Sequence, residues 1–311
     1  MMRNTFIKTL IEQARVDDSI FVITPDLGFS VLETFREEFP SRFLNVGIAE
    51  QNAIGVAAGL ALSGYKVYVY SIIPFITMRC YEQIRLEAAY MNTNIRLVGV
   101  GAGFSYGAQG ATHHALEDIA IMRVLPNMTV CCPGDPIEVE ALTKESFHHQ
   151  GPMFIRLAKN GEVNIHEADT EITLGKAISV THGEDLALIT TSNMLEQGRQ
   201  WVCEWSAKGI NAELISMHTI KPLDIEKINT LIRAGKPIIT LEEHSIIGGL
   251  GSAVAEVIAE SGCGIKFKRV AVPDRYSHTV GHQQRLRKHF EIEKVNLKDV
   301  GIRWEVENNE K

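Results

Sequence analysis

Short runs rich in β-branched residues alternate along the chain with longer stretches in which apolar residues recur every three or four positions. Runs such as 66–71 and 95–100 are mostly apolar, which is typical of parallel strands buried on both faces. The intervening stretches, such as 136–149 and 194–207, have the spacing of amphipathic helices. This alternation predicts an α/β fold of doubly wound domains, with mainly parallel sheets and helices on both faces.

The same pattern predicts where the elements and the domains lie. Apolar periodicity fades and charge rises after residue 158, so we expect two domains, 1–160 and 185–311, joined by a linker at 161–184. The other strands are expected at 20–24, 128–132, 153–157, 186–190, 211–215, 237–241 and 266–272, and further helices at 76–90 and 251–260.

Charge and cysteine content exclude several classes of protein. With 31 basic and 38 acidic side chains the formal net charge is −7, so no basic excess exists to bind nucleic acid. The longest apolar run, 53–62, is too short to span a membrane, and the first residues lack the apolar core of a signal peptide. The five cysteines form no CxxC pair, which gives no sign of a zinc site or a disulfide framework. We therefore expect a cytoplasmic protein with no metal site of its own.

The most informative segment is 43–64, in which Glu50 opens an almost wholly apolar helix. A carboxylate at this position has a purely structural interpretation, because it stabilises the positive end of a helix by about 0.3–1 kcal/mol. Gly55 and Gly59 lie four residues apart on one face, a spacing that favours close packing against another helix or subunit.

The sequence Gly47-Ile-Ala-Glu-Gln51, followed by the small-residue helix 57–61, resembles the pyrimidine-binding domain of the transketolase family, whose members use thiamine diphosphate. The resemblance continues, in order, through 81–85, 110–114, 116–120, 122–128, 155–157, 219–224 and 241–252. It implies a pyrimidine-binding domain followed by a transketolase C-terminal domain, and it covers essentially the whole chain.

This resemblance assigns the residues that contact the cofactor. It makes Glu50 the catalytic carboxyl that bonds the ring nitrogen of the aminopyrimidine and promotes its imino tautomer. Phe75 is placed against the aminopyrimidine ring, and Ile72 takes a second stacking position with an aliphatic side chain. Asp26 and Leu27 are placed near the cofactor, although an ordinary turn after a strand explains them equally well.

On the substrate side, the resemblance places His113 in the channel as a catalytic and sugar-facing residue, with Ser30 nearby. Gln109 stands where the family commonly has an aspartate that contacts a substrate hydroxyl. Positions 101–102 carry glycine and alanine where relatives have a histidine or arginine facing the acceptor phosphate. Lys159 is then the remaining candidate for a phosphate contact, and a solvated linker lysine is the alternative interpretation. His114, His244, His278 and His282 receive no role from the sequence.

The motif that holds diphosphate and magnesium in this family is absent, and Gly134-Asp135-Pro136 is its only near match. Proline there lacks the backbone donor that a phosphate cradle uses. The resemblance therefore implies the C-terminal subunit of a split transketolase. An N-terminal partner subunit would hold the diphosphate with Mg²⁺ or Ca²⁺, most simply in an α2β2 assembly, and the enzyme would move a two-carbon ketol unit from a ketose sugar to an aldehyde.

Three alternatives stay open at this point. The chain resembles, more distantly, a deoxyxylulose-phosphate synthase or the β subunit of a 2-oxoacid dehydrogenase. It could also be a non-catalytic partner that stabilises or regulates a thiamine enzyme. The missing arginine near Ala102 argues against the synthase, the 47–51 segment argues against the dehydrogenase, and retention of Glu50, Phe75 and His113 argues against the non-catalytic partner.

Overall fold

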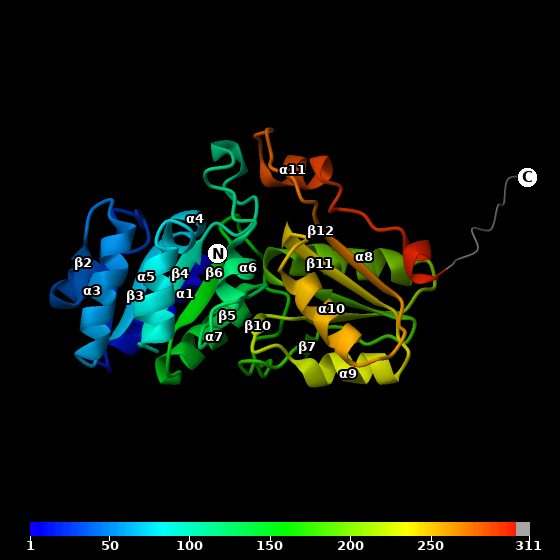
Figure 1. Cartoon of the computed structure of the whole chain (residues 1–311), viewed down its shortest axis with the longest axis horizontal. Helices are drawn as coiled ribbons and strands as arrows, with labels where there is room; N and C mark the ends of the chain where they lie inside the picture. Colours follow the sequence, from blue (N-terminus) through cyan, green and yellow to red (C-terminus); the bar gives the residue numbers. More distant parts are fainter. Residues whose placement is uncertain (303–311) are drawn as a thin grey trace, which may run out of the picture.

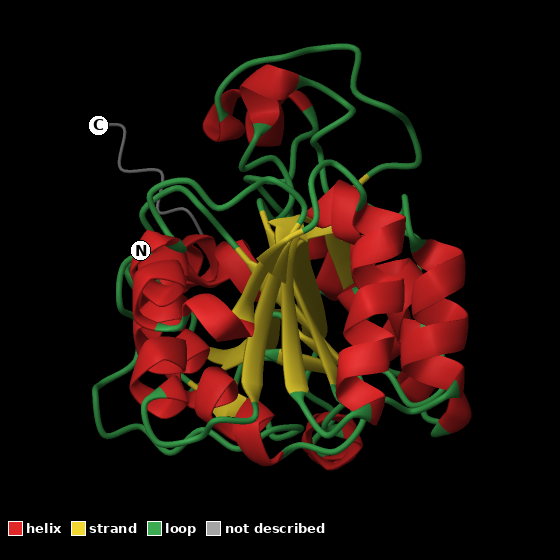
Figure 2. Cartoon of the chain, turned by 90° about the vertical axis from the view of Figure 1, so that its left-hand side faces the viewer, coloured by secondary structure: helices red, strands yellow, loops and turns green. Residues whose placement is uncertain are grey.

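The computed structural model describes residues 1–302, which form two domains side by side, each built around its own sheet (Figure 1). The larger sheet has the strand order β10-β5-β6-β4-β3-β1-β2, and every neighbouring pair in it is parallel except β10 with β5. Figure 2 shows this sheet between two layers of helices. Its strands are β1 (Ile20–Thr24), β2 (Phe43–Asn45), β3 (Lys66–Ile72), β4 (Ile95–Val100), β5 (Thr129–Cys131), β6 (Met153–Leu157) and β10 (Thr219–Lys221).

The second sheet has the order β12-β11-β8-β9-β7, in which β7 alone runs antiparallel to its neighbour. Its strands are β7 (Ile178–Ser179), β8 (Leu186–Thr190), β9 (Ala212–Ser216), β11 (Ile238–Ser245) and β12 (Phe267–Val272). The expected α/β fold of two mainly parallel domains is therefore confirmed.

Helices follow most strands, as the parallel connections require. In the first domain they are α1 (Met2–Ala14), α2 (Glu33–Glu38), α3 (Glu50–Leu62), α4 (Ile73–Thr77), α5 (Tyr81–Gln83), α6 (Asp118–Arg123) and α7 (Pro136–His148), and in the second α8 (Leu195–Ser206), α9 (Ile225–Arg233), α10 (Leu250–Glu260) and α11 (Gln283–His289). Shorter or wider turns form η1 (Pro40–Arg42), the π-helix η2 (Ile84–Tyr90), η3 (Gly107–Gln109), η4 (Ser192–Met194) and η5 (Leu297–Val300).

The central strands are buried on both faces, which explains their nearly continuous apolar sequence. Gly99 on β4 is required by packing, because a Cβ there would come within 2.7 Å of Ile73 and 2.9 Å of Phe154. The absence of a side chain lets the start of α4 lie directly on β4. This close approach fixes the position of α4, which carries one of the predicted site residues.

The two domains are joined by shared strands and buried charges. β10, although it follows β9 in the chain, adds an antiparallel strand to the edge of the larger sheet beside β5. Arg156 on β6 is fully buried and pairs with Asp118 at 2.7 Å, while also donating to Ser192 and to the backbone of Glu243 in the second domain. At the top of Figure 1 the loop after β4 lies beside α11, and the Gly281 amide donates to the Gly107 carbonyl at 3.2 Å.

Several local predictions need correction. The helix expected at 76–90 begins earlier, at Ile73, and is divided into α4, α5 and η2, with turns at 78–80. The pattern does not predict β2, β7 or β10, because two or three residues are too few to show a period. The stretch 161–184 contains β7, and the domain boundaries themselves stay a prediction. Within residues 1–302 no helix is long and apolar enough to cross a membrane.

Candidate active site

The predicted site residues share one edge of the larger sheet. Because its strands are parallel, with the exception of β10, the loops that follow their carboxyl ends meet at the same edge. Loop 25–32 follows β1, loop 46–49 follows β2, Ile72 ends β3, loop 101–117 follows β4 and residue 158 follows β6. Ile72 is buried in the core at the carboxyl end of β3.

Glu50 is the first residue of α3, and its carboxylate is buried with 3% of its side chain exposed. It accepts a hydrogen bond from Nη1 of Arg79 at 2.7 Å. The same guanidinium stacks on the ring of Phe75, with its Cζ 4.2 Å from the ring centroid. The planar guanidinium of Arg79 therefore contacts both the buried carboxylate of Glu50 and the aromatic face of Phe75.

His113 completes this group from the loop after β4. Its ring packs edge-on against Phe75, with the centroids 5.1 Å apart, and its Nδ1 lies 2.9 Å from the hydroxyl of Thr112. Burial, and then the positive charge of Arg79, lower the pKa of His113 below its usual value. The imidazole is therefore neutral at pH 7 and available as a hydrogen-bond donor or acceptor.

The ring of Tyr106 fills the space that a side chain at position 101 would need. Gly101 has φ +100, and a Cβ there would overlap the Tyr106 ring. Ala102 is fully buried. The ammonium of Lys159 lies over the same tyrosine ring, 4.0 Å from its centroid, and Tyr106 in turn packs against His113 at 6.0 Å. Lys159 and Tyr106 thus form a stacked pair beside His113.

Gln109 and Lys159 differ in their surroundings. Gln109 lies in the exposed turn η3, where its side chain faces solvent. Lys159 is partly buried, and this burial together with the charge of Arg3 lowers the pKa of its ammonium. Lys159 is therefore linked to the His113 group through Tyr106, whereas Gln109 is connected to it through the loop backbone.

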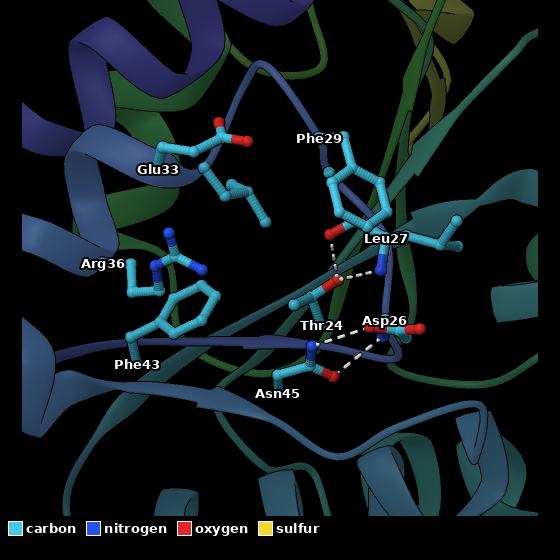
Figure 3. Close-up of a pocket in the computed structure, with 10 residues that line it drawn as sticks. Thr24, Asp26, Leu27, Phe29, Glu33, Arg36, Phe43 and Asn45 are labelled. Atoms are coloured by element: carbon cyan, nitrogen blue, oxygen red, sulfur yellow. Dashed lines mark hydrogen bonds between the residues drawn. The ribbon is translucent and has the colours of Figure 1, made fainter.

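Asp26 and Leu27 line a small pocket between loop 25–32, α2 and β2 (Figure 3), and Ser30 lies in the same loop. Asp26 and Asn45 exchange two hydrogen bonds of 3.0 Å, which ties this loop to the end of β2. The backbone of Leu27 bonds the hydroxyl of Thr24. The carboxylate of Glu33 accepts from the Ser30 amide at 2.7 Å.

Asp135, in the near match to the diphosphate motif, is fully engaged in holding the fold together. One of its oxygens caps α7 by accepting from the Glu138 amide at 2.8 Å. The other accepts from the amides of Ile165 and His166 and from the His166 ring. Among the described residues, 1–302, no group of three histidine, cysteine, aspartate or glutamate side chains is arranged to hold a metal ion.

The histidines without a predicted role differ in their contacts. His114 is buried against Phe104 and its Nε2 lies 3.3 Å from the Gly107 carbonyl. His244 bonds the Ala120 amide from the second domain, and His282 caps α11, whereas His278 is exposed.

Sequence reasoning missed Arg79, Tyr106 and Asn45. Arg79 follows Phe75 by four residues, a spacing that places two side chains on one helical face and could have been noticed. The contacts of Tyr106 with Lys159 and of Asn45 with Asp26 join separate parts of the chain, so no local sequence pattern predicts them.

The fold is a pair of mainly parallel α/β domains, and Glu50, Phe75 and His113 lie together at one edge of the larger sheet. Residues 1–161 match the transketolase pyrimidine-binding domain, and residues 175–296 match the transketolase C-terminal domain. The chain belongs to the transketolase family.

Its relatives include chains of nearly the same length. It is 36% identical to one of the subunits of the apulose-4-phosphate transketolase of Phocaeicola vulgatus, over 95% of this chain and 94% of that one. It is also 36% identical to a 6-deoxy-6-sulfo-D-fructose transketolase subunit of a Clostridium species, over 93% and 89% of the two chains. A solved split-gene transketolase, described as an inactive β4 tetramer, is 33% identical and superposes with a TM-score of 0.85 over 96% of this chain and 95% of that one.

Proposed function

We propose that this chain is the C-terminal subunit of a thiamine-diphosphate-dependent transketolase that acts in the cytoplasm. It transfers a two-carbon ketol unit from a ketose sugar to an aldehyde acceptor, and it requires an N-terminal partner subunit, most simply in an α2β2 assembly. The observation that carries the proposal is the meeting of Glu50 and Phe75 at the edge of the parallel sheet, with His113 beside them.

The residues present fit an aminopyrimidine ring. Such a ring is flat, stacks on an aromatic face and donates an N–H to a carboxylate when its ring nitrogen is protonated. The guanidinium of Arg79 has these same properties, and it already lies on Phe75 and against Glu50. The two side chains therefore accept a planar N–H donor of the kind that the cofactor presents.

Bound thiamine diphosphate supplies the electron sink for breaking a carbon–carbon bond beside a ketone. The chain's own residues supply position and proton control. Glu50 shares a proton with the ring nitrogen of the aminopyrimidine, which favours the imino tautomer. Phe75 and Ile72 form the apolar wall that keeps water away from the ring, while Asp26 and Leu27 border it from the loop after β1.

The substrate side is formed by the loop after β4 and its neighbours. His113, neutral at pH 7, hydrogen-bonds the oxygens of the sugar, and Ser30 contributes a hydroxyl from the loop after β1. Gln109 and Lys159 contact the acceptor. Glutamine is neutral and both donates and accepts hydrogen bonds, so it tolerates an acceptor carbonyl where an aspartate would demand a hydroxyl.

The partner subunit holds the diphosphate and its Mg²⁺ or Ca²⁺ ion. The near match to the diphosphate motif supports placing the diphosphate on the partner. Both carboxylate oxygens of Asp135 already accept hydrogen bonds within this chain. Matches to relatives named as transketolase subunits, over nearly their whole length, favour this assignment over a synthase, a dehydrogenase subunit or a non-catalytic partner.

The test is reconstitution with the N-terminal subunit, followed by a screen of ketose donors and aldehyde acceptors. In the complex, Glu50→Gln is expected to lower turnover by about 10²–10⁴-fold, because glutamine keeps the size of the side chain but cannot share a proton. Glu260→Gln, at the exposed end of α10, is the matched control and is expected to leave turnover unchanged.

Calorimetry of the isolated chain supplies a second readout. Without the partner, thiamine diphosphate is expected to bind weakly or not at all, since the anionic end of the molecule has no site here. Micromolar binding to the isolated chain would contradict the division of the site between two subunits.

A further inference from the structure

Arg79 lies between the two residues that the proposed function assigns to the aminopyrimidine. Its Nη1 is 2.7 Å from Oε1 of Glu50, and its Cζ is 4.2 Å from the centroid of Phe75. The carboxylate is 3% exposed, whereas the arginine side chain is 44% exposed. One end of the arginine therefore reaches into a buried site while the rest of it stays in contact with water.

The guanidinium makes there the two contacts that an aminopyrimidine requires. It is planar and stacked on an aromatic face, and it donates an N–H to the same buried carboxylate. While the guanidinium lies on this face of Phe75 and bonds Oε1 of Glu50, a second planar donor cannot make the same two contacts. Arginine and cofactor ring thus compete for one set of contacts.

We propose that Arg79 is an internal occupant of the pyrimidine subsite, and that thiamine diphosphate binds only after displacing it. This inference rests on the proposed function. Arg79 acts on cofactor affinity through Glu50 and Phe75, and the chain carries its own competing ligand for this part of the site.

The physical reason for such an occupant lies in the burial of Glu50. A carboxylate taken out of water without a partner costs several kcal/mol, and an adjacent guanidinium offsets that cost. In the chain without cofactor, Arg79 fills this role and covers the exposed face of Phe75. When the cofactor ring donates to Glu50 instead, the ring replaces the arginine as the partner that offsets the cost of burying the carboxylate.

The local backbone makes the exchange inexpensive. Arg79 lies in the turns at 78–80 that separate α4 from α5, beside the exposed Met78. Its side chain is long and already half in solvent, so the guanidinium can return to water by rotating its own torsions. Nothing in α4 or α5 has to unfold for the subsite to open.

The proposal predicts that removing Arg79 strengthens cofactor binding. If only a fraction of the molecules has the subsite open, the apparent dissociation constant equals the intrinsic one divided by that fraction. In the reconstituted complex with Mg²⁺, we expect Arg79→Ala to bind thiamine diphosphate about five- to tenfold more tightly than the wild type, by isothermal titration calorimetry. Arg79→Lys, which keeps the charge but not the flat guanidinium, should fall between them. Arg85→Ala, an exposed arginine on η2, is the matched control and should bind like the wild type.

Thermal unfolding of the cofactor-free complex gives a readout that does not depend on turnover. Arg79→Ala should lower the melting temperature because Glu50 is left unpaired, and Glu50→Gln added to it should restore the wild-type value. The increase in melting temperature on adding cofactor should be larger for Arg79→Ala than for the wild type.

The outcomes separate the two claims. If the wild-type complex binds no thiamine diphosphate, the proposed function fails and this inference fails with it. If the wild type binds but Arg79→Ala and Arg79→Lys bind equally or more weakly, Arg79 belongs to the cofactor site itself, and the internal occupant is refuted while the proposed function stands.

Discussion

Two buried glutamates, Glu50 in the first domain and Glu243 in the second, are each paired with an arginine, but their surroundings differ. Glu243, at the end of β11, accepts hydrogen bonds from the backbone of Phe104 and from the side chains of Asn193, Gln283 and Arg287. Its arginine is itself buried, with 7% of the side chain exposed. The arginine of Glu50 is 44% exposed and comes from a turn.

The two glutamates differ in whether the paired arginine is buried or exposed, and this difference separates a structural carboxylate from one that can bind a ligand. A buried carboxylate that accepts hydrogen bonds from several elements holds those elements together. Losing any of these partners is costly, because it leaves an uncompensated charge in a low dielectric. Glu243 joins the loop after β4, through the Phe104 amide, to Gln283 and Arg287 of α11. A carboxylate whose partner can return to water is instead ready for a ligand, and Glu50 has this property.

The largest expected effect comes from removing the buried carboxylate of Glu243. Glu243→Ala leaves Arg287 buried without its carboxylate, and we expect the free energy of unfolding to fall by about 3–5 kcal/mol in urea titrations. Glu256→Ala is the control, because it removes an exposed partner of Arg123 and should cost at most about 1 kcal/mol. An equal fall in the free energy of unfolding for both variants would show that Glu243 does not hold these elements together.

A smaller effect is expected at the acceptor end of the site. One lysine over a tyrosine ring gives a single flexible ammonium contact, whereas an added histidine or arginine would form a multidentate anion site. We therefore expect the preference for phosphorylated over matched unphosphorylated aldehydes to stay below about 100-fold in kcat/KM, roughly 2.7 kcal/mol. Lys159→Ala should reduce it further. A preference above about 100-fold that survives Lys159→Ala would place the anion site elsewhere.

The smallest expected effect is on the titration of His113. Burial first, and then the charge of Arg79, lower its pKa, so the folded chain binds this proton less readily than the unfolded chain. Its contribution to stability therefore becomes unfavourable as the pH falls below the ordinary histidine value. Arg79→Ala should raise the pKa of His113 toward that value by less than about one pH unit, measured by NMR, with Arg85→Ala as the control. An unchanged or lower pKa in Arg79→Ala would remove the arginine from the surroundings of His113.

The sequence predicted the larger sheet well because its central strands are buried on both faces and so carry long apolar runs. β10 escaped prediction for the opposite reason. It is three residues long, and its place beside β5 depends on how the second domain packs against the first.

The site shows the same division. The motif around Glu50 is local and could be recognised, whereas its pairing with Arg79 depends on a turn that interrupts a predicted helix. The sequence shows glycine and alanine at positions 101–102, but the packing of the Tyr106 ring against Gly101 could be known only from the folded loop.

The roles of the two glutamates are separated by measuring one pair of variants, Glu50→Gln and Glu243→Gln, in two assays. For Glu50→Gln in the reconstituted enzyme, we expect a loss of turnover of about 10²–10⁴-fold, with the free energy of unfolding changed by no more than about 1 kcal/mol. For Glu243→Gln we expect a loss of about 1.5–3 kcal/mol of stability, since a charged hydrogen-bond acceptor is removed from a buried network. A Glu50→Gln enzyme that keeps more than about half of the wild-type turnover would show that Glu50 is not the carboxyl that activates the cofactor.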